Sequence, residues 1–466
     1  MAETVSETGS WRELLGQHLG MSTLLAGGVL LYSTNEFLTV SMLPTIIADI
    51  GGARLFSWAT TLYLIGSVVS AALVHPILQR IGARRAYLIG LSLFALASAV
   101  NVVAPGMAVL VAGRALRGVS GGLLAGLGYA LINTALPRSL WTRGSALVSA
   151  MWGVSTLIGP VAGGIFAQLG LWRWAYVAMG VATGLMALLV VTVLKPGRID
   201  PAREKPVTPT RKVPLWSLLL MSSAALTVSV AALPHRLVEN LGVLLAGLLL
   251  VVAFILVDRR MSVAVLPRSV FGPGPSKWIY LTMSVQMAAA MANTYVPLFG
   301  QKLADLSPAE AGFLGAALAT GWTGSEIVSA SLTDRRVIGR VVVAGPLMMA
   351  AGLALAAVTQ RAYAPLGVVA LWALALLITG AGIGIGWPHL AVRAMDSDDP
   401  EQSSAAAAAI NTVQLVSAAF GAGLAGVVVN LAEADDATAA RWLYLVFAML
   451  AASGVLASYR AVRDRR

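Results

Sequence analysis

Long apolar segments recur along the whole chain and are separated by short loops that carry charges, prolines or glycines. As helices rising about 1.5 Å per residue, segments of this length match the roughly 30 Å hydrocarbon core of a bilayer. Hydropathy and length place them near residues 21–48, 56–78, 86–103, 107–133, 145–168, 173–194, 215–234, 240–257, 278–300, 308–330, 340–358, 364–389, 404–430 and 442–459. The sequence therefore predicts an all-α membrane protein with fourteen transmembrane helices.

The balance of residue types agrees with an integral membrane protein. Only 11% of the 466 residues are charged, against about 25% in soluble domains. The chain contains no cysteine, which excludes disulfides and thiolate metal sites. Its first 20 residues are polar, so we expect no cleavable signal peptide.

The positions of the basic residues indicate how the chain is oriented. If the N-terminus is cytoplasmic, 24 of the 32 lysines and arginines fall in cytoplasmic segments, six fall in outer segments, and Arg114 and Arg117 fall inside a helix. Cytoplasmic loops of membrane proteins carry such an excess of positive charge. We therefore expect both termini in the cytoplasm. The net charge of +11 then needs no nucleic-acid partner.

Two basic connectors divide the predicted helices into groups of six, two and six. Two halves of equal size are typical of an internally repeated transporter with its site between the halves. The predicted organisation is a cytoplasmic segment (1–20), an N-terminal six-helix bundle (21–194), a linker (195–214), a two-helix hairpin (215–257), a second linker (258–277), a C-terminal six-helix bundle (278–460) and a cytoplasmic tail (461–466).

One carboxylate falls near the middle of the first predicted helix. Glu36, preceded by Asn35, would lie only a few residues from the bilayer midplane. A charge at that depth costs about 2.5–3.5 kcal/mol for Asp, Lys or Arg on insertion scales, and proton uptake by an acid relieves the cost. We expect Glu36 to bind a proton or a cationic substrate. A purely structural interhelical hydrogen bond is the alternative.

Three further charged residues in apolar segments are candidates for the same site. Glu326 is either a coupling residue or a structural one near the cytoplasmic interface, where it could pair with an arginine. Arg114 and Arg117 stay charged when buried and need a carboxylate, carbonyl or water as partner. We expect Arg114 to act on a neighbouring acid, although both arginines could instead lie near the outer interface. Glu310 completes a capping box with Ser307 and is structural.

Glycines are concentrated in two of the predicted helices. In 145–168, close helix approach and a bend are favoured by Gly153, Gly159, Pro160, Gly163 and Gly164. In 364–389, two overlapping GxxxG pairs on different faces favour tight packing; they are Gly380, Gly382, Gly384 and Gly386. This second run does not match the GxGxxG spacing of a dinucleotide site, and no strand precedes it.

Two other patterns carry weak signals. Residues 118–122 match the GxSxG of hydrolases around Ser120, but the strand–turn–helix context is missing and nothing orients His75 or His389 toward it. We therefore expect no enzyme, and we interpret each histidine as a helix-end residue. Side chains that could line a central cavity are Tyr32, Tyr129, Trp152, Gln286, Asn293, Tyr295, Asn411 and Gln414.

Residues 75–85, residues 114–118 and Gly153 through Gly164 together resemble the major facilitator superfamily, specifically its fourteen-helix drug:proton antiporter branch. Residues 75–85, HPILQRIGARR, are similar to the loop signature GxLxDRxGRR, and residues 114–118, RALRG, are similar to the helix-4 motif RxxQG. Gly153 through Gly164 resembles the antiporter motif of helix 5, the most specific of the three. Residues 171–174 and 405–426 extend the resemblance over most of the chain.

The resemblance implies a major facilitator fold with alternating access between the two six-helix bundles. It implies that Arg114 takes part in proton coupling and that Gly159 and Pro160 shape an exporter-type conformational preference. Glu36 stands where related exporters often have an acid that binds a cation or a proton.

The chain departs from these motifs at three positions. His75 replaces the first glycine of the loop signature, Gln79 replaces its aspartate, and Arg117 replaces the glutamine of the helix-4 motif. In the family that aspartate helps to hold the outward-open state. The balance between states would then rest on Arg80, Arg84 and Arg85; Gly82 is the other remaining member of the loop signature.

Together these features predict a proton-coupled secondary active exporter of amphipathic small molecules in a bacterial plasma (inner) membrane. Glu36 would be protonated from outside and would release its proton inside in exchange for substrate. We expect the proton gradient to drive transport without a cofactor or metal. The expected partners are protons, small-molecule substrates and the lipid bilayer, and the expected oligomeric state is a monomer. The alternatives left open are a translocator of lipids or cell-envelope precursors, a solute uptake transporter and an intramembrane serine hydrolase.

Overall fold

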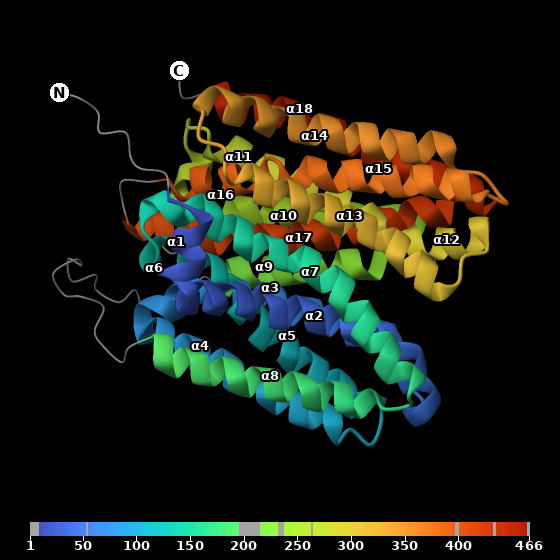
Figure 1. The fold of residues 1–466 in the computed structure, drawn as a ribbon, viewed down its shortest axis with the longest axis horizontal. Helices are drawn as coiled ribbons and strands as arrows, with labels where there is room; N and C mark the ends of the chain where they lie inside the picture. The colour runs from blue at the N-terminus through green and yellow to red at the C-terminus, as the bar shows by residue number, and fades with distance from the viewer. Residues whose placement is uncertain are drawn as a thin grey trace.

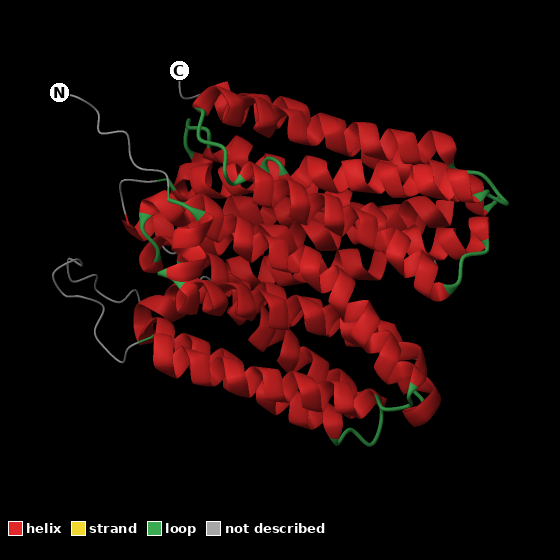
Figure 2. Cartoon of the chain, in the orientation of Figure 1, coloured by secondary structure: helices red, strands yellow, loops and turns green. Residues whose placement is uncertain are grey.

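The computed structural model describes residues 9–52, 55–194, 215–231, 237–261, 264–396, 400–431 and 435–463. Helices account for nearly all of these residues, and no strand occurs among them (Figure 1, Figure 2). In these ranges nine helices are long and apolar enough to cross a membrane, and shorter apolar helices lie at Leu62–Ala72 and Trp216–Val228. The predicted all-α membrane class is confirmed. Fourteen crossings remain a prediction that these helices are compatible with, and the predicted linker 195–214 lies outside the described residues.

Six long helices in the first part of the chain pack on one another. We name this group the N-terminal lobe: α2 (Leu19–Ile50), α3 (Phe56–Ala72), α4 (Val74–Val102), α5 (Met107–Ala130), α7 (Trp141–Gln168) and α8 (Trp172–Val193). The short elements α6 (Ile132–Ala135) and η2 (Arg138–Leu140) join α5 to α7, and α1 (Trp11–Gly16) precedes α2.

The last part of the chain forms a second group, which we name the C-terminal lobe. It consists of α11 (Ser276–Ala290), η4 (Met291–Tyr295), α12 (Val296–Ala304), α13 (Pro308–Ser329), α14 (Arg335–Thr359), α15 (Leu366–Gly384), α16 (Trp387–Met395), α17 (Pro400–Leu431) and α18 (Asp436–Arg463). Between the lobes in sequence, α9 (Leu215–Ala231) and α10 (Leu237–Asp258) pack on each other, and α9 also contacts α3 and α17. The short turn η3 (Arg268–Phe271) precedes α11. The lobes meet where α7 contacts α13 and where α17 contacts α3 and α5.

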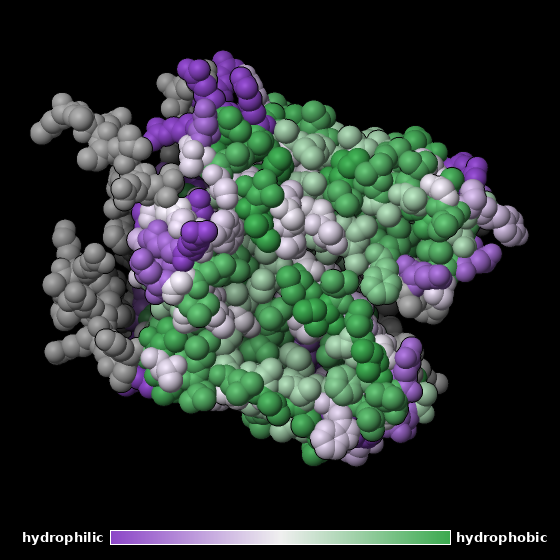
Figure 3. All heavy atoms as spheres, in the orientation of Figure 1, coloured by the Kyte–Doolittle hydropathy of each residue, from purple (hydrophilic) through white to green (hydrophobic). Residues whose placement is uncertain are grey.

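Both described ends of the chain lie at the same end of the molecule (Figure 1). We name this the terminal end, and the opposite one the far end. Polar residues gather at the two ends, whereas apolar residues cover the sides between them (Figure 3). Leu188 and Val181 on α8, for example, are 62% and 60% exposed. Such an apolar belt is the surface that a bilayer covers.

Three predicted segments differ from the observed helices. The predicted loop between 78 and 86 is almost entirely helical, because α4 continues through it and only Gly82 leaves the helix, with φ +73°. This left-handed conformation favours glycine, which has no Cβ to clash. The predicted helix 278–300 is interrupted by η4 just before Pro297, which cannot donate a backbone hydrogen bond, and 364–389 is divided between α15 and α16.

Two glycine faces hold α15 in the C-terminal lobe. A Cβ on Gly380 would lie 1.9 Å from the Leu318 carbonyl oxygen on α13, and a Cβ on Gly382 would lie 2.6 Å from the Gly345 carbonyl oxygen on α14. Both distances are too short for any side chain. The predicted packing of these glycines on two different faces is confirmed.

Candidate functional site

Glu36 lies midway along α2 with a half-buried side chain. The Arg114 guanidinium on α5 and the Tyr63 hydroxyl on α3 face its carboxylate. One carboxylate oxygen, Oε2, is buried and has no hydrogen-bond partner in the described structure. A group that accepts a proton or a cation therefore sits beside a fixed positive charge, in the interior of the N-terminal lobe.

Arg114 is held in place by α3. Its side chain is 1% exposed. The guanidinium stacks on the Tyr63 ring with 4.2 Å between its carbon and the ring centroid, and its Nε donates to the Ala59 carbonyl oxygen at 3.2 Å. The charge of Arg114 is therefore enclosed between α5 and α3, and its action on a neighbouring acid stays a prediction.

Two tyrosines, Tyr32 and Tyr63, lie near this carboxylate. Tyr32 and Tyr63 stack with ring centroids 5.6 Å apart, and Trp152 of α7 meets Tyr32 edge-on at 5.4 Å. The Tyr63 hydroxyl donates to the Tyr32 carbonyl oxygen at 3.1 Å. A carboxylate among aromatic faces favours amphipathic cations. Sequence reasoning missed Tyr63. The sequence shows only that a tyrosine lies inside an apolar segment, and this does not reveal which face of the helix carries its side chain.

Arg117 occupies a second buried position, one turn further along α5. Its side chain is 0% exposed, and it donates to Asn35 Oδ1 and to Ser98 Oγ. The guanidinium carbon lies 4.8 Å from the ring centroids of both Phe94 and Tyr176. Asn35, which the sequence grouped with Glu36 as a coupling residue, is therefore a partner of Arg117 and ties α2 to α5.

Replacing Arg117 by alanine is expected to destabilise the N-terminal lobe by about 3 kcal/mol or more. The change opens a cavity and removes the donor to Asn35 Oδ1 in a fully buried site. Thermal unfolding in detergent, followed by tryptophan fluorescence, measures the effect against Arg85→Ala, because Arg85 is exposed. Equal melting temperatures for the two variants would contradict a structural role for Arg117.

A second acid lies at the interface between the lobes. Glu326 on α13 is 0% exposed, and neither carboxylate oxygen has a hydrogen-bond partner in the described structure. Ser149 of α7, Trp322 of α13 and Tyr129 of α5 face it. The Trp387 indole of α16 donates to the Tyr129 hydroxyl at 3.4 Å. Both lobes therefore contribute to this site, and no ion pair of the described residues includes Glu326, so the arginine partner considered from the sequence is wrong.

The other predicted lining residues divide between this interface and the interior of the C-terminal lobe. Gln414 on α17 is buried and faces Tyr129, so it belongs to the Glu326 site. Asn411 on the same helix is buried, with both polar side-chain atoms unpartnered in the described structure. Gln286 donates to the Gly382 carbonyl oxygen at 3.1 Å and joins α11 to α15.

Asn293 and Tyr295 lie in η4, and each is half-buried. The Tyr295 ring packs against Phe299 with centroids 6.1 Å apart. Both residues belong to the interrupted helix of the C-terminal lobe, and their place in a central cavity stays a prediction.

Three of the four glycines in the predicted helix-5 motif approach another helix closely. A Cβ on Gly159 would lie 2.6 Å from Phe37 Cβ, and one on Gly163 would lie 2.5 Å from the Leu38 carbonyl oxygen, so both bring α7 close to the helix of Glu36. Gly153 faces the other lobe, whereas Gly164 has no neighbour within 4 Å. Pro160 lies inside α7, which remains one helix from Trp141 to Gln168.

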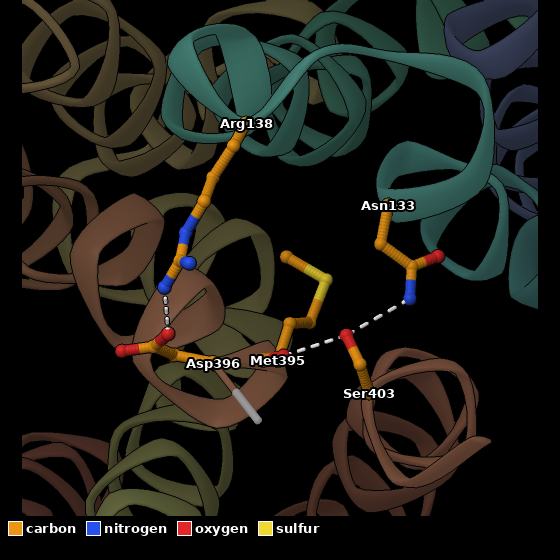
Figure 4. Close-up of polar contacts among 5 residues, drawn as sticks. All are labelled: Asn133, Arg138, Met395, Asp396 and Ser403. Carbon is orange, nitrogen blue, oxygen red and sulfur yellow. Dashed lines mark hydrogen bonds and ion pairs between the residues drawn. The ribbon is translucent and has the colours of Figure 1, made fainter. Parts of the chain in front are cut away.

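At the terminal end, polar contacts join the two lobes (Figure 4). Arg138 of η2 forms an ion pair with Asp396, which follows α16. Asn133 Nδ2 donates to Ser403 Oγ on α17 at 3.0 Å, and Ser403 Oγ donates to the Met395 carbonyl oxygen at 2.6 Å. Sequence reasoning did not find these residues, because their partners lie more than 250 positions away in the chain.

Comparison with known proteins shows which family has this architecture. A family model described as the Major Facilitator Superfamily matches residues 25–422. The chain belongs to the major facilitator superfamily. It is similar to a protein of Mycobacterium tuberculosis strain H37Rv named "Probable multidrug-efflux transporter", with 67% identity over 100% of this chain and 99% of that protein. The puromycin resistance protein of Streptomyces alboniger is 30% identical over 70% of this chain and 65% of its own length.

The crystal structure of the human organic anion transporter MFSD10 has the same fold. It matches 94% of this chain with a TM-score of 0.70 at 15% identity, and the match covers 99% of that structure's chain. The predicted major facilitator fold is therefore confirmed. Gly82 belongs to the loop signature of the superfamily, and it is the one residue inside α4 with a non-helical backbone conformation.

The other loop-signature residues lie around that glycine at the terminal end. Gln79 and Arg84 are half-buried, and Arg80 and Arg85 are exposed. One ion pair between the lobes of this superfamily member joins Arg138 and Asp396.

The residues that resembled an enzyme motif have structural partners in this superfamily member. Ser120 is buried inside α5, where its Oγ donates to the Arg117 carbonyl oxygen at 3.0 Å. A hydrolase elbow needs a strand before the serine and a turn at it, and a continuous helix provides neither. His389 lies 3.1 Å from Ser329 Oγ, and the predicted capping box of Ser307 and Glu310 is confirmed.

Proposed function

We propose that this superfamily member is a proton-coupled secondary active exporter of amphipathic small molecules, cationic ones among them. The observation that carries the proposal is the 67% identity, over the full length, to a protein named a multidrug-efflux transporter. The arrangement around Glu36 supplies the chemistry, because one carboxylate among aromatic rings can hold either a proton or an organic cation.

Competition for Glu36 provides the coupling in this proposal. When Glu36 is protonated it carries no charge, and a cationic substrate loses the group that attracts it. When the proton leaves, the carboxylate is restored beside Arg114 and the aromatic rings, and substrate binds. Exchange of one for the other on opposite sides of the membrane then couples export to proton entry. Glu326 is a second candidate for proton coupling, since it lies where the lobes meet.

Alternating access would move the N-terminal lobe (21–194) against the C-terminal lobe (278–460), with the hairpin 215–257 beside them. Hydrogen bonds between the lobes in the described residues lie toward the terminal end, such as those of Tyr129 and Asn133. At the far end the surface is hollowed between the lobes (Figure 3). With the terminal end in the cytoplasm of a bacterium, as the basic residues favour, this is an outward-facing state of a monomer in the inner membrane.

Transport by purified protein in liposomes tests the proposal. Ethidium serves as the cationic probe, and a pH-sensitive dye reports protons on the opposite side. In liposomes where the cytoplasmic side of the protein faces outward, an acidic lumen is expected to drive ethidium into the lumen while protons leave it. A protonophore is expected to abolish both movements. Accumulation that is unaffected by the protonophore would contradict proton coupling, and no accumulation of ethidium or of other amphipathic cations would contradict the substrate class.

A further inference from the structure

Helix α1 lies at the terminal end, where it connects the two lobes (Figure 1). It packs against α2 and α7 of the N-terminal lobe. From there the Trp11 indole Nε1 donates to Ser331 Oγ at 3.2 Å, and Ser331 belongs to the connection between α13 and α14 in the C-terminal lobe. One short helix therefore contacts both lobes.

Specific contacts hold α1 on the N-terminal lobe. A helix of six residues is not stable by itself in water, so its position depends on its surroundings. Ser10 and Glu13 form a capping box at its start. Leu14 is 0% exposed, and its carbonyl oxygen accepts a hydrogen bond from Ser22 Oγ of α2 at 2.9 Å. These contacts make α1 a fixed part of that lobe.

Gly9, two residues before α1, lies against η2, the element that supplies Arg138 to an ion pair between the lobes. A Cβ on Gly9 would lie 2.4 Å from Leu140 Cδ2 and 3.1 Å from the Ser139 carbonyl oxygen. Both residues follow Arg138, which pairs with Asp396. The close approach at Gly9 thus lies next to the residue that forms the ion pair drawn in Figure 4.

We propose that α1 is a clasp that holds the terminal end closed. Because Leu14 anchors α1 to the N-terminal lobe, separation of the lobes at this end must break the hydrogen bond from Trp11 to Ser331. The clasp thereby raises the population of the closed state and slows opening toward the cytoplasm. This inference rests on the alternating access proposed above, and it adds a regulatory element that lies outside the Glu36 site.

Distance measurements between spin labels test the clasp. The chain has no cysteine, so Thr192→Cys on α8 and Arg340→Cys on α14, both at exposed positions, carry the labels. Trp11→Phe keeps the ring and removes the N–H donor. It is expected to increase the fraction of open terminal ends about two- to tenfold, the range for one hydrogen bond. Arg12→Ala, an exposed change in the same helix, is expected to leave the distances unchanged.

A second variant guards against local unfolding of α1. Ser331→Ala removes the acceptor from the other lobe and is expected to give the same shift as Trp11→Phe, with no further shift in the double variant. Unchanged distances in both single variants would overturn the clasp. The measurement uses no substrate and no proton gradient, so a shifted distance distribution without ethidium transport would instead count against the proposed function alone.

Discussion

Replacing Glu36 by glutamine is expected to reduce proton-driven transport to the level of empty liposomes. Glutamine keeps the shape of the side chain, but it cannot release a proton or balance the charge of a cationic substrate. Arg114, which faces the carboxylate, would then repel the substrate without opposition. Purified variant in liposomes with an imposed pH gradient, assayed for ethidium uptake and proton release, measures this loss.

Glu310→Gln is the matched control for that change. Glu310 lies at the start of α13, where its carboxylate accepts hydrogen bonds from the Ser307 backbone and hydroxyl. Glutamine can also complete a capping box, so the change removes only the negative charge at the start of the helix and is expected to cost about 0.3–1 kcal/mol of stability while transport is retained. Transport by Glu36→Gln at the level of this control would remove Glu36 from the mechanism.

Replacing Gly153 by alanine is expected to lower transport by roughly an order of magnitude, the equivalent of about 1.4 kcal/mol. The added Cβ would lie 1.9 Å from Thr323 Oγ1 and 3.0 Å from the Ala319 carbonyl oxygen, both on α13 of the opposite lobe. Since the second neighbour is backbone, α7 and α13 must move apart. The lobes could then no longer close fully at the terminal end.

Two further variants isolate this contact. Gly164→Ala changes the same helix and the same motif at a position with no neighbour within 4 Å, so its transport is expected to match that of the unchanged protein. Combining Gly153→Ala with Thr323→Ala removes the closest clashing atom and is expected to restore part of the activity. Equal transport by the two glycine variants would mean that lobe closure does not depend on Gly153.

Much of the fold could be predicted from hydropathy, and the reason is physical. Inside a bilayer each backbone polar group must be satisfied within its own helix, so long apolar segments have one available conformation. The interruptions depend on local chemistry that hydropathy does not measure. Gly82 takes a left-handed conformation between two helical segments, and Pro297 follows a turn rather than a continuous helix.

The candidate site could be predicted only in part. A charged side chain in an apolar helix is expensive, which singled out Glu36 and Arg114 without knowledge of their neighbours. Which residues meet them depends on packing between segments far apart in the chain. Asn35 turned out to be a partner of Arg117, and Tyr63 joined the site from α3. Helical periodicity defines a face but does not say which helix covers it.

The ion pair between Arg138 and Asp396 has a consequence for the energy of the transport cycle. The side chains are 72% and 24% exposed, and pairs at such surfaces contribute about 0–1 kcal/mol. Dissolved salt weakens them further, since the screening length is about 8 Å at physiological ionic strength. A contact that must be broken at every turnover works best when it is weak. Ambient ions would therefore adjust how readily the lobes separate, with no change in any side chain.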